Sequence, residues 1–192
     1  MAGALGPGVR VGDVVLAETL LQHDLDVSPL FPRFEVPGTG RSHFPADATM
    51  NRALAVAAEA TLAQAAAHIG ADHLAGFGIR TPRLHRGLVV SGDRFVSMAA
   101  ESDALRRLLP DALAVEMEGA ALAQVCGDFG VPCAVLRTVS DRADDEAHVD
   151  FNAFIAEVAS VYTRAMVSAW LAAPEAAGRS GADGTGAGPA AG

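Results

Sequence analysis

The stretch ALAVEMEG, residues 112–119, places two carboxylates where a short apolar run ends. The apolar run predicts a buried strand, and the alanine-rich segment that follows, to about Phe129, predicts a helix. Along a strand, Glu116 and Glu118 point to one side and Met117 to the other. Glu118 would then meet the positive end of the helix dipole, at the sheet edge where open α/β proteins bind ligands. The alternative is that both glutamates are ordinary residues of a first helical turn.

Two more apolar runs end in polar residues in the same way. GLVVSGDRF, residues 87–95, runs into Ser-Gly-Asp, and VLRTVSD, residues 135–141, ends in Ser-Asp. Helical segments separate the three strands, so we expect their ends to rim one ligand site in an α/β sheet. Arg137 lies inside the last strand and should pair with a buried carboxylate, for which Glu116 is a candidate.

Periodicity and capping residues predict the remaining elements. A strand is expected over residues 11–21, and a helix capped by Asp47 over residues 48–69. A short helix is expected over residues 101–109. A last helix, capped by Asp150, is expected over residues 151–172, with one apolar face made by Phe154, Val158, Val161 and Ala165.

The composition indicates one domain and excludes several kinds of partner. The chain has 192 residues, 51% of them apolar, which is enough for one domain with a sizeable core. We expect that domain to span residues 1–173, and residues 174–192 to form a disordered tail. The net charge of −9 argues against a nucleic-acid partner. No apolar run reaches membrane-spanning length and no secretory signal opens the chain, so we expect a cytoplasmic protein without a membrane partner.

Neither the cysteines nor a local cluster of acidic residues predicts a metal site. Cys126 and Cys133 lack CxxC spacing and a nearby histidine, so we expect two small buried thiols. His23, Asp24 and Asp26 form an HDxD sequence that looks like a metal cluster, but they are adjacent and no second group of ligands is evident. We therefore do not interpret His23 as a metal ligand, and we expect neither a metal nor a cofactor.

The motifs VVSGDRF, VEMEGAA and LRTVSDRAD, with VGDVV at residues 11–15 and QHDLDVSP at residues 22–29, resemble the purine nucleoside phosphorylase family. Within it, the resemblance is strongest to the 5'-methylthioadenosine/S-adenosylhomocysteine nucleosidase branch. The likeness runs from about Ala2 to about Trp170 and keeps the motifs in the family's order. It implies a three-layer α/β/α fold with a central mixed β-sheet, nucleoside phosphorylase-like, of which the N-terminal strands are missing.

The resemblance implies hydrolysis of the N-glycosidic bond of 5'-methylthioadenosine or S-adenosylhomocysteine, releasing adenine in methionine salvage. Such a reaction needs an acid that protonates the leaving base and groups that hold the sugar as it becomes cationic. Asp141 suits the first role, as the catalytic residue, and Ser140 would orient it. Glu118 would accept hydrogen bonds from the ribose hydroxyls, and Met117 would contact the sugar.

The same resemblance assigns the base to the segment after the strand expected at residues 88–90. The ring of Phe95 would stack on adenine, and the backbone of Val96 would bond to the base edge. The backbone around Gly3 would also contact the substrate. A lone phenylalanine is, however, more often a core residue than a ligand contact.

A long loop rich in proline and phenylalanine spans residues 27–45 and shows no period. It is either a surface loop folded onto its own domain or an interface that closes a neighbour's pocket. The resemblance favours the second reading. It implies a homodimer in which Val27, Leu30 or Phe31, and Pro37 of one subunit complete the alkylthio pocket of the other.

The first eight residues read as a glycine-rich turn rather than as an element that opens a domain. In the resembled family, the part before this turn carries the glutamate that activates the attacking water, and no residue here matches it. We therefore expect a gene model that starts too late, and a 192-residue chain that is poorly active or inactive by itself. The alternatives are a purine nucleoside phosphorylase, an aminofutalosine-type nucleosidase, or a non-catalytic truncated relative that only binds nucleoside.

Overall fold

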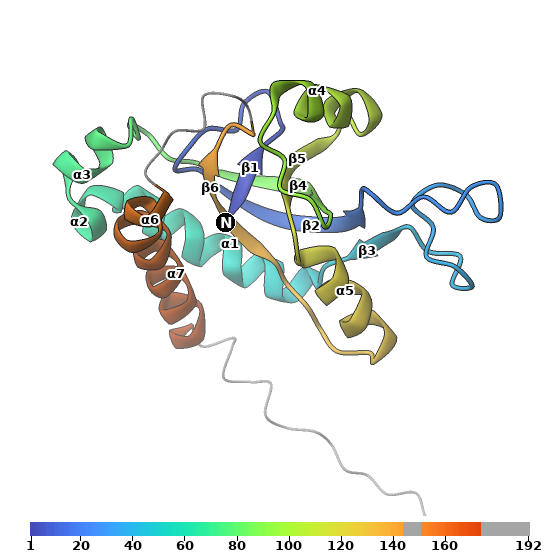
Figure 1. The fold of residues 1–192 in the computed structure, drawn as a ribbon. Coiled ribbons are helices and arrows are strands. Elements are labelled where there is room, and N and C mark those ends of the chain that lie inside the picture. Colours follow the sequence, from blue (N-terminus) through green and yellow to red (C-terminus); the bar gives the residue numbers. More distant parts are fainter. Residues whose placement is uncertain (144–150, 174–192) are drawn as a thin grey trace, which may run out of the picture.

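The computed structural model describes residues 1–143 and 151–173, and a mixed six-stranded sheet forms its centre (Figure 1). The strands are β1 (Ala2–Ala4), β2 (Val14–Gln22), β3 (His43–Pro45), β4 (Leu84–Ser91), β5 (Ala112–Glu116) and β6 (Leu136–Asp141). They lie in the order β3-β2-β4-β5-β1-β6, with β2, β4 and β5 parallel to one another. The expected α/β fold with a mixed sheet is confirmed.

The sheet closes on itself through a second pairing of β2. The first half of β2 pairs antiparallel with β6, with Val14 opposite Thr138, and its second half pairs with β3. Strands β2, β4, β5, β1 and β6 therefore form a ring of hydrogen-bonded neighbours. Val15, Val89 and Ala114, from three of these strands, belong to one buried cluster. Nothing local in the sequence predicts this closure, because it joins segments that lie far apart along the chain.

Helices pack around the sheet, and α1 and α7 lie side by side (Figure 1). Their bounds are α1 (Ala48–Ala63), α2 (Ala65–Ile69), α3 (Ala71–Gly76), α4 (Ala99–Leu108), α5 (Gly119–Asp128), α6 (Phe151–Phe154) and α7 (Ser160–Ala172), with a π-helical turn, η1 (Ile155–Ala159), before α7. Asp47 caps α1 as predicted, since its Oδ1 accepts a hydrogen bond from the Met50 N–H at 2.7 Å. Among the described residues, no helix combines the length and the apolar character that crossing a membrane requires.

Several predicted elements are wrong in detail. The helix predicted over residues 48–69 is interrupted at Gln64, and β4 begins at Leu84 rather than near residue 88. The opening residues do not form only a turn, because Ala2–Ala4 make strand β1 between β5 and β6. Small side chains allow this: a Cβ on Gly3 would lie 2.9 Å from both Asp141 Oδ1 and the Ala143 Cβ.

The last helical segment forms over residues 151–172, but the face that it buries differs from the prediction. Val161 and Ala165 are only partly buried. The π-helical turn holds one residue more per turn than an α-helix, so the next fully buried position after residue 158 is 162 rather than 161. The fully buried positions therefore recur every four residues along the segment. The fully buried residues are Phe154, Val158, Tyr162 and Met166. The expected cap at Asp150 and the expected tail at residues 174–192 lie outside the described residues.

Candidate active site

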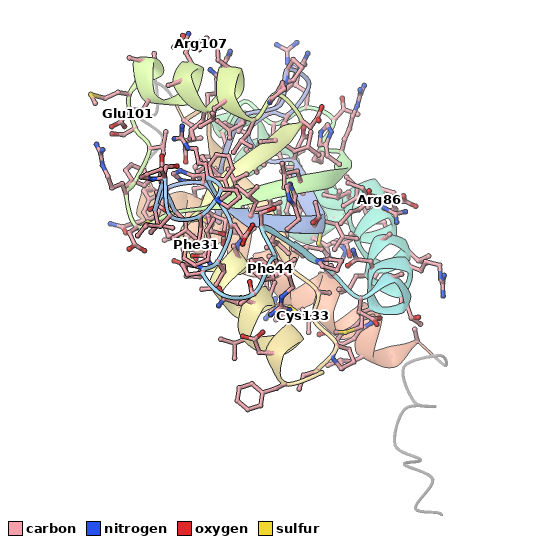
Figure 2. The ribbon with its side chains drawn as sticks, turned by 90° about the vertical axis from the view of Figure 1, so that its right-hand side faces the viewer. Phe31, Phe44, Arg86, Glu101, Arg107 and Cys133 are labelled. Atoms are coloured by element: carbon pink, nitrogen blue, oxygen red, sulfur yellow. The ribbon has the colours of Figure 1, made fainter. Side chains whose placement is uncertain are left out.

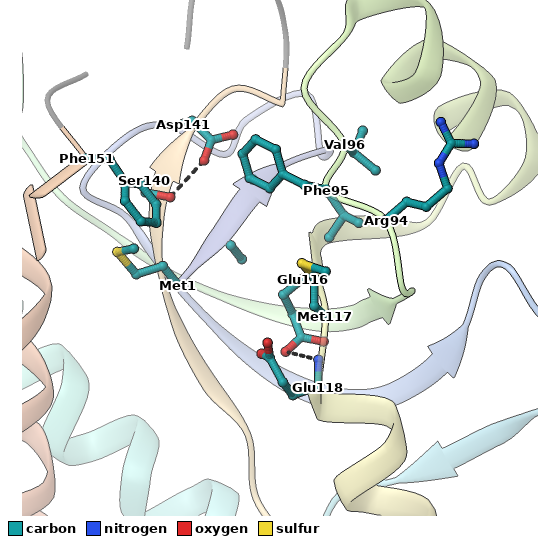
Figure 3. A pocket seen from close by; sticks show the side chains of 13 residues that line it. Met1, Arg94, Phe95, Val96, Glu116, Met117, Glu118, Ser140, Asp141 and Phe151 are labelled. Atoms are coloured by element: carbon teal, nitrogen blue, oxygen red, sulfur yellow. Dashed lines mark hydrogen bonds between the residues drawn. The ribbon is translucent and has the colours of Figure 1, made fainter. Parts of the chain in front are cut away.

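A pocket of about 190 Å³ lies where β4, β5 and β6 end, next to β1 (Figure 3). All the residues predicted to bind substrate or to catalyse line it: Gly3, Phe95, Val96, Met117, Glu118, Ser140 and Asp141. They come from four separate parts of the chain. The structure thus brings the predicted residues together, and the role of each stays a prediction.

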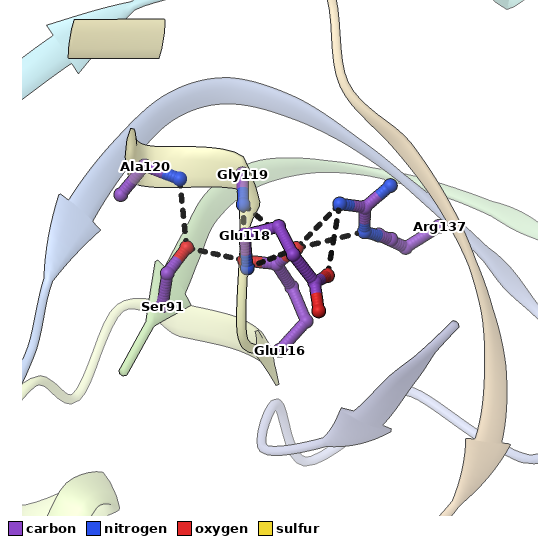
Figure 4. A network of polar contacts seen from close by, with 6 residues as sticks. All are labelled: Ser91, Glu116, Glu118, Gly119, Ala120 and Arg137. Atoms are coloured by element: carbon purple, nitrogen blue, oxygen red, sulfur yellow. Dashed lines mark hydrogen bonds and ion pairs between the residues drawn. The ribbon is translucent and has the colours of Figure 1, made fainter. Parts of the chain in front are cut away.

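Glu116, at the end of β5, is the centre of a buried polar network (Figure 4). Its side chain is 1% exposed, and its Oε2 accepts hydrogen bonds from Nε and Nη2 of Arg137 at 2.9 and 2.6 Å. The predicted pairing of Arg137 with Glu116 is confirmed. The Ser91 hydroxyl donates to Oε1, and the Gly119 N–H donates to both carboxylate oxygens at 2.9 Å.

This network keeps Glu116 ionised and fixes the start of α5. Burial by itself raises the pKa of Glu116, but the hydrogen bond from Ser91 and the charge and hydrogen bonds of Arg137 outweigh it, so the pKa is lowered. Ser91 also accepts a hydrogen bond from the Ala120 N–H at 2.8 Å. The N–H groups of Gly119 and Ala120, in the first turn of α5, thus donate to Glu116 and Ser91. Since Ser91 in turn donates to Glu116, this carboxylate supports the first turn of the helix.

Glu118 is the N-cap residue of α5, and its side chain is 73% exposed. Its Oε2 lies 3.6 Å from Nη2 of Arg137, so the two glutamates share one arginine, as expected for side chains that point to one side of the strand. Their environments differ, since the carboxylate of Glu116 is enclosed and that of Glu118 faces the pocket (Figure 3). A carboxylate placed in this way can accept hydrogen bonds from a ligand hydroxyl pair. Met117, between them, is partly exposed in the same pocket.

Asp141, the last residue of β6, is 7% exposed and is held at both carboxylate oxygens (Figure 3). The Ser140 hydroxyl donates to Oδ2 at 2.8 Å, and the Ala143 N–H donates to Oδ1 at 2.8 Å. Gly3 leaves room for this carboxyl group, because a Cβ at that position would crowd Oδ1. Asp141 is therefore a buried and oriented carboxyl group on the wall of the pocket.

Phe95 is 61% exposed, and its ring lies on the pocket (Figure 3), so it is not a core residue. Val96 is buried and lines the same pocket. The pocket is also lined by residues that were not predicted as site residues: Met1, Ala2, Arg94, Val115, Glu116 and Phe151. Arg94 stands directly before Phe95 in the quoted motif, but its guanidinium binds Glu101 at 2.6 Å. Phe151 comes from a distant helix, and no local pattern in the sequence points to it.

The residues predicted to complete a neighbour's pocket do not line this one. Val27, Leu30 and Pro37 lie in the loop between β2 and β3, which projects away from the body of the molecule (Figure 1). Leu30 is 82% exposed. Phe31 belongs to the same loop, which crosses the face shown in Figure 2.

The described side chains that could hold a metal are histidines, cysteines, aspartates and glutamates. Within residues 1–143 and 151–173, no group of three or more histidines, cysteines, aspartates or glutamates is placed to bind an ion. Cys126 and Cys133 are free and partly exposed, so the expectation of buried thiols is wrong. Partial burial, together with the neighbouring Cys126, raises the pKa of Cys133 to about 11, which leaves its thiol protonated at neutral pH.

The mixed sheet and the pocket at its strand ends define an α/β protein with a cavity in the crevice where open α/β sheets usually hold their ligands. The family model described as the phosphorylase superfamily matches residues 1–172. The chain belongs to the phosphorylase superfamily.

Individual proteins of this superfamily are similar to the chain over most of its length. The chain is 37% identical over 159 residues to the 5'-methylthioadenosine/S-adenosylhomocysteine nucleosidase of Anoxybacillus flavithermus, covering 82% of this chain and 60% of that protein. It is similar to the crystal structure of the nucleosidase of the same name from Neisseria meningitidis in complex with methylthio-immucillin-A, with a TM-score of 0.68, 32% identity, and coverage of 88% of this chain and 65% of that one. The futalosine hydrolase of Helicobacter pylori is similar with a TM-score of 0.64 and 32% identity, over 88% and 65% of the two chains. The chain thus spans less than two thirds of the length of these relatives.

Proposed function

We propose that this pocket binds an adenine nucleoside and that the protein hydrolyses the N-glycosidic bond of 5'-methylthioadenosine or S-adenosylhomocysteine, a step of methionine salvage. The observation that carries the proposal is that one pocket joins the buried carboxyl group of Asp141, the exposed ring of Phe95 and the carboxylate of Glu118. A nucleoside has a flat base, a leaving group that needs a proton, and a sugar with two neighbouring hydroxyls. Each of these parts has a matching group here.

Asp141 would act as the general acid. Cleavage breaks the bond between C1' of the ribose and N9 of adenine, and the electron pair of that bond moves into the base. A proton given by Asp141 to N7 lets adenine leave as a neutral molecule, an effect that is typically worth about 10²–10⁴ in rate. The hydrogen bonds from Ser140 and from the Ala143 N–H would fix the orientation of the carboxyl group for this transfer.

Glu118 would stabilise the sugar as the bond breaks. The ribose becomes oxocarbenium-like, and the carboxylate would accept hydrogen bonds from the 2'- and 3'-hydroxyls and favour the positive charge. Water then adds to C1' and gives up a proton to the surrounding solvent, from which Asp141 regains the proton that it gave to N7; the products are adenine and the free 5'-substituted ribose. Arg137, held by Glu116, limits the positions that the Glu118 side chain can take.

The size of the pocket supports a contribution from a second subunit. Its volume of about 190 Å³ is below the ~300–1,000 Å³ of sites that enclose a drug-sized ligand. The matching groups account for base and ribose, so the 5'-substituent would extend beyond the pocket. We propose that, in a homodimer, the loop between β2 and β3 of the second subunit covers the 5'-substituent through Val27, Leu30 or Phe31, and Pro37.

An apolar surface next to that loop supports the homodimer. Leu122, Val125 and Phe129 follow one another on the exposed side of α5 and just after its end. The loop and the helix are tied together, since the guanidinium of Arg41 pairs with Asp128. Exposed apolar patches of this kind mark interaction surfaces. The cytoplasmic location that we propose is supported by the two unpaired cysteines, which are typical of a reducing compartment.

A second candidate, aminofutalosine-type nucleosidase activity, is favoured by one observation, the similarity to the futalosine hydrolase structure at 32% identity. It would use the same base-binding and acid groups and differ in the 5'-substituent, which would reach beyond the lining that residues 1–143 and 151–173 provide. Comparing the two substrates in one assay separates these functions.

The test is adenine release from 5'-methylthioadenosine in phosphate-free buffer, by the chain and by its Asp141→Asn variant. Asp72→Asn, an exposed aspartate on α3, is the matched control. In keeping with the poor activity expected for this chain, we expect slow release, which falls at least ~100-fold further in Asp141→Asn and is unchanged in the control. Release that requires phosphate would indicate a phosphorylase, and a folded chain that binds adenine without turnover would indicate a non-catalytic relative. A folded chain that neither releases nor binds adenine would overturn the proposal.

A further inference from the structure

The HDxD segment, His23–Asp26, lies beside the turn that leads to Phe95. Strands β2 and β4 are parallel neighbours, and Gln22 at the end of β2 pairs with Ser91 at the end of β4. The HDxD segment therefore leaves the sheet next to the turn that begins at Gly92. The two segments, about seventy positions apart in sequence, meet at Asp93, directly before Arg94, Phe95 and Val96, which line the pocket.

Two hydrogen bonds fasten the turn to this segment. The Asp93 N–H donates to Oδ2 of Asp24 at 2.6 Å, and the His23 N–H donates to the Ser91 carbonyl oxygen at 2.9 Å. The first is a backbone donor bound to a carboxylate, which is among the stronger kinds of hydrogen bond in proteins. Asp24 thus holds the turn two residues before the ring that faces the pocket.

The imidazole of His23 fills the space under the same turn. It is buried, and its Nε2 has no hydrogen-bond partner among the residues that the structure describes. A Cβ on Gly92 would lie only 2.3 Å from that Nε2, so glycine alone fits against the ring. Burial lowers the pKa of His23, which leaves the imidazole neutral at neutral pH.

The opposite side of the turn rests on the network of Glu116. The Gly92 N–H donates to the Glu116 carbonyl oxygen at 3.1 Å, and the Ser91 hydroxyl donates to the Glu116 carboxylate. The turn therefore has two supports, one from β5 and one from the HDxD segment. The side that carries Asp24 is the exposed one, so it is the support that can be removed without opening the core.

We propose that Asp24 is a positioning residue for the base: its carboxylate, by holding the Asp93 N–H, sets the turn that presents Phe95 and Val96 to adenine. The inference rests on the proposed function of the pocket. In this proposal the turn contacts the base and not the sugar. Loss of Asp24 would therefore lower the affinity for free adenine and the affinity for the whole nucleoside by the same factor. Loss of Glu118 would lower the affinity for the nucleoside and leave the affinity for free adenine unchanged.

The experiment measures, by calorimetry, the affinity of the chain for adenine and for 5'-methylthioadenosine. Its variants are Asp24→Ala, Asp24→Asn and Glu118→Gln, with Asp26→Ala as the matched control. Asp26 belongs to the same motif, but its carboxylate binds the Ser28 N–H of its own loop at 3.0 Å. We expect Asp24→Ala to lower the affinity for both ligands about tenfold, which corresponds to the loss of one hydrogen bond to a charged group. Asp24→Asn should regain most of the affinity, because an amide oxygen also accepts the Asp93 N–H.

A second pair of variants tests the other half of the support. Gly92→Ala should weaken adenine binding because its Cβ would lie 2.3 Å from His23 Nε2 and 2.9 Å from Asp24 Oδ2, and His23→Ala added to Gly92→Ala should restore most of it by removing the closer of the two clashes. Thermal unfolding of the same samples shows that each variant is folded. Adenine affinity that is equal in the wild type and Asp24→Ala, or lowered as much by Asp26→Ala, would overturn this inference while leaving the proposed function in place. A wild-type chain that binds no adenine would overturn both.

Discussion

Replacing Arg137 by leucine removes the cation that neutralises Glu116. The guanidinium makes two hydrogen bonds to Oε2 of Glu116, at 2.9 and 2.6 Å, and the glutamate side chain is 1% exposed. Removing one partner of a buried ion pair typically costs ~3–5 kcal/mol, because the other charge stays buried. Arg137 itself is 22% exposed, so we place the loss of unfolding free energy near the lower end, at about 3 kcal/mol.

The assay is urea unfolding at about pH 7, followed by circular dichroism, with Arg86→Leu as the matched control. Arg86 lies 3.3 Å from Glu18, but those side chains are 43% and 53% exposed, so that pair should contribute only about 0–1 kcal/mol. In a domain of this size, the loss in Arg137→Leu corresponds to a fall in Tm of roughly 6–12 °C.

The pH dependence gives a second readout. The pKa of Glu116 is lowered in the folded protein, so its ionised form contributes stability above the ordinary glutamate pKa of 4.5, and this contribution is lost as pH falls through the folded value. Without Arg137, the folded pKa rises, and the deficit relative to the wild type should shrink as the pH approaches 4.5. This reasoning would be refuted if Arg137→Leu lost no more unfolding free energy than Arg86→Leu. It would also be refuted if the deficit of Arg137→Leu were the same at about pH 7 and near pH 4.5.

Three further changes test other parts of the structure. Gly3→Val should abolish binding of 5'-methylthioadenosine in calorimetry, because even a Cβ lies 2.9 Å from Asp141 Oδ1; binding at wild-type affinity would contradict the placement of that carboxyl group. Phe129→Ser, at a residue that is 80% exposed, should convert a dimer to a monomer in sedimentation with little change in Tm, and an unchanged dimer would argue against the α5 surface as the interface. Phe154→Ala should lower the unfolding free energy by ~3–5 kcal/mol, since the ring is fully buried and packs edge-on against Phe77 with centroids 5.5 Å apart; a loss below ~1 kcal/mol would contradict its place in the core.

The parts that the sequence predicted are those with a local cause. The strand ends at Glu116 and Asp141 were visible because an apolar run stops at a polar pair, and the cap at Asp47 because a helix start needs an acceptor. The pairing of Arg137 followed from a single charge inside an apolar strand. Each of these inferences needed only a few neighbouring residues.

The parts that were not predicted depend on distant segments or on backbone detail. Strand β1 has three small residues, and it forms because Gly3 fits between β5 and β6 rather than because Ala2–Ala4 favour a strand. The pairing of β2 with β6 joins residues more than a hundred positions apart. The contribution of Phe151 to the pocket has the same origin, since only the packing of the last helix brings it there.

The most direct test of the proposed site is a crystal structure of the chain with 5'-methylthioadenosine or a non-hydrolysable analogue. We expect the base to lie against Phe95, with N7 within about 3.2 Å of an Asp141 carboxyl oxygen, and both ribose hydroxyls on the carboxylate of Glu118. A ligand that is ordered in another part of the protein, or that turns its sugar rather than its base toward Asp141, would contradict the assignment of this pocket as an adenine nucleoside site.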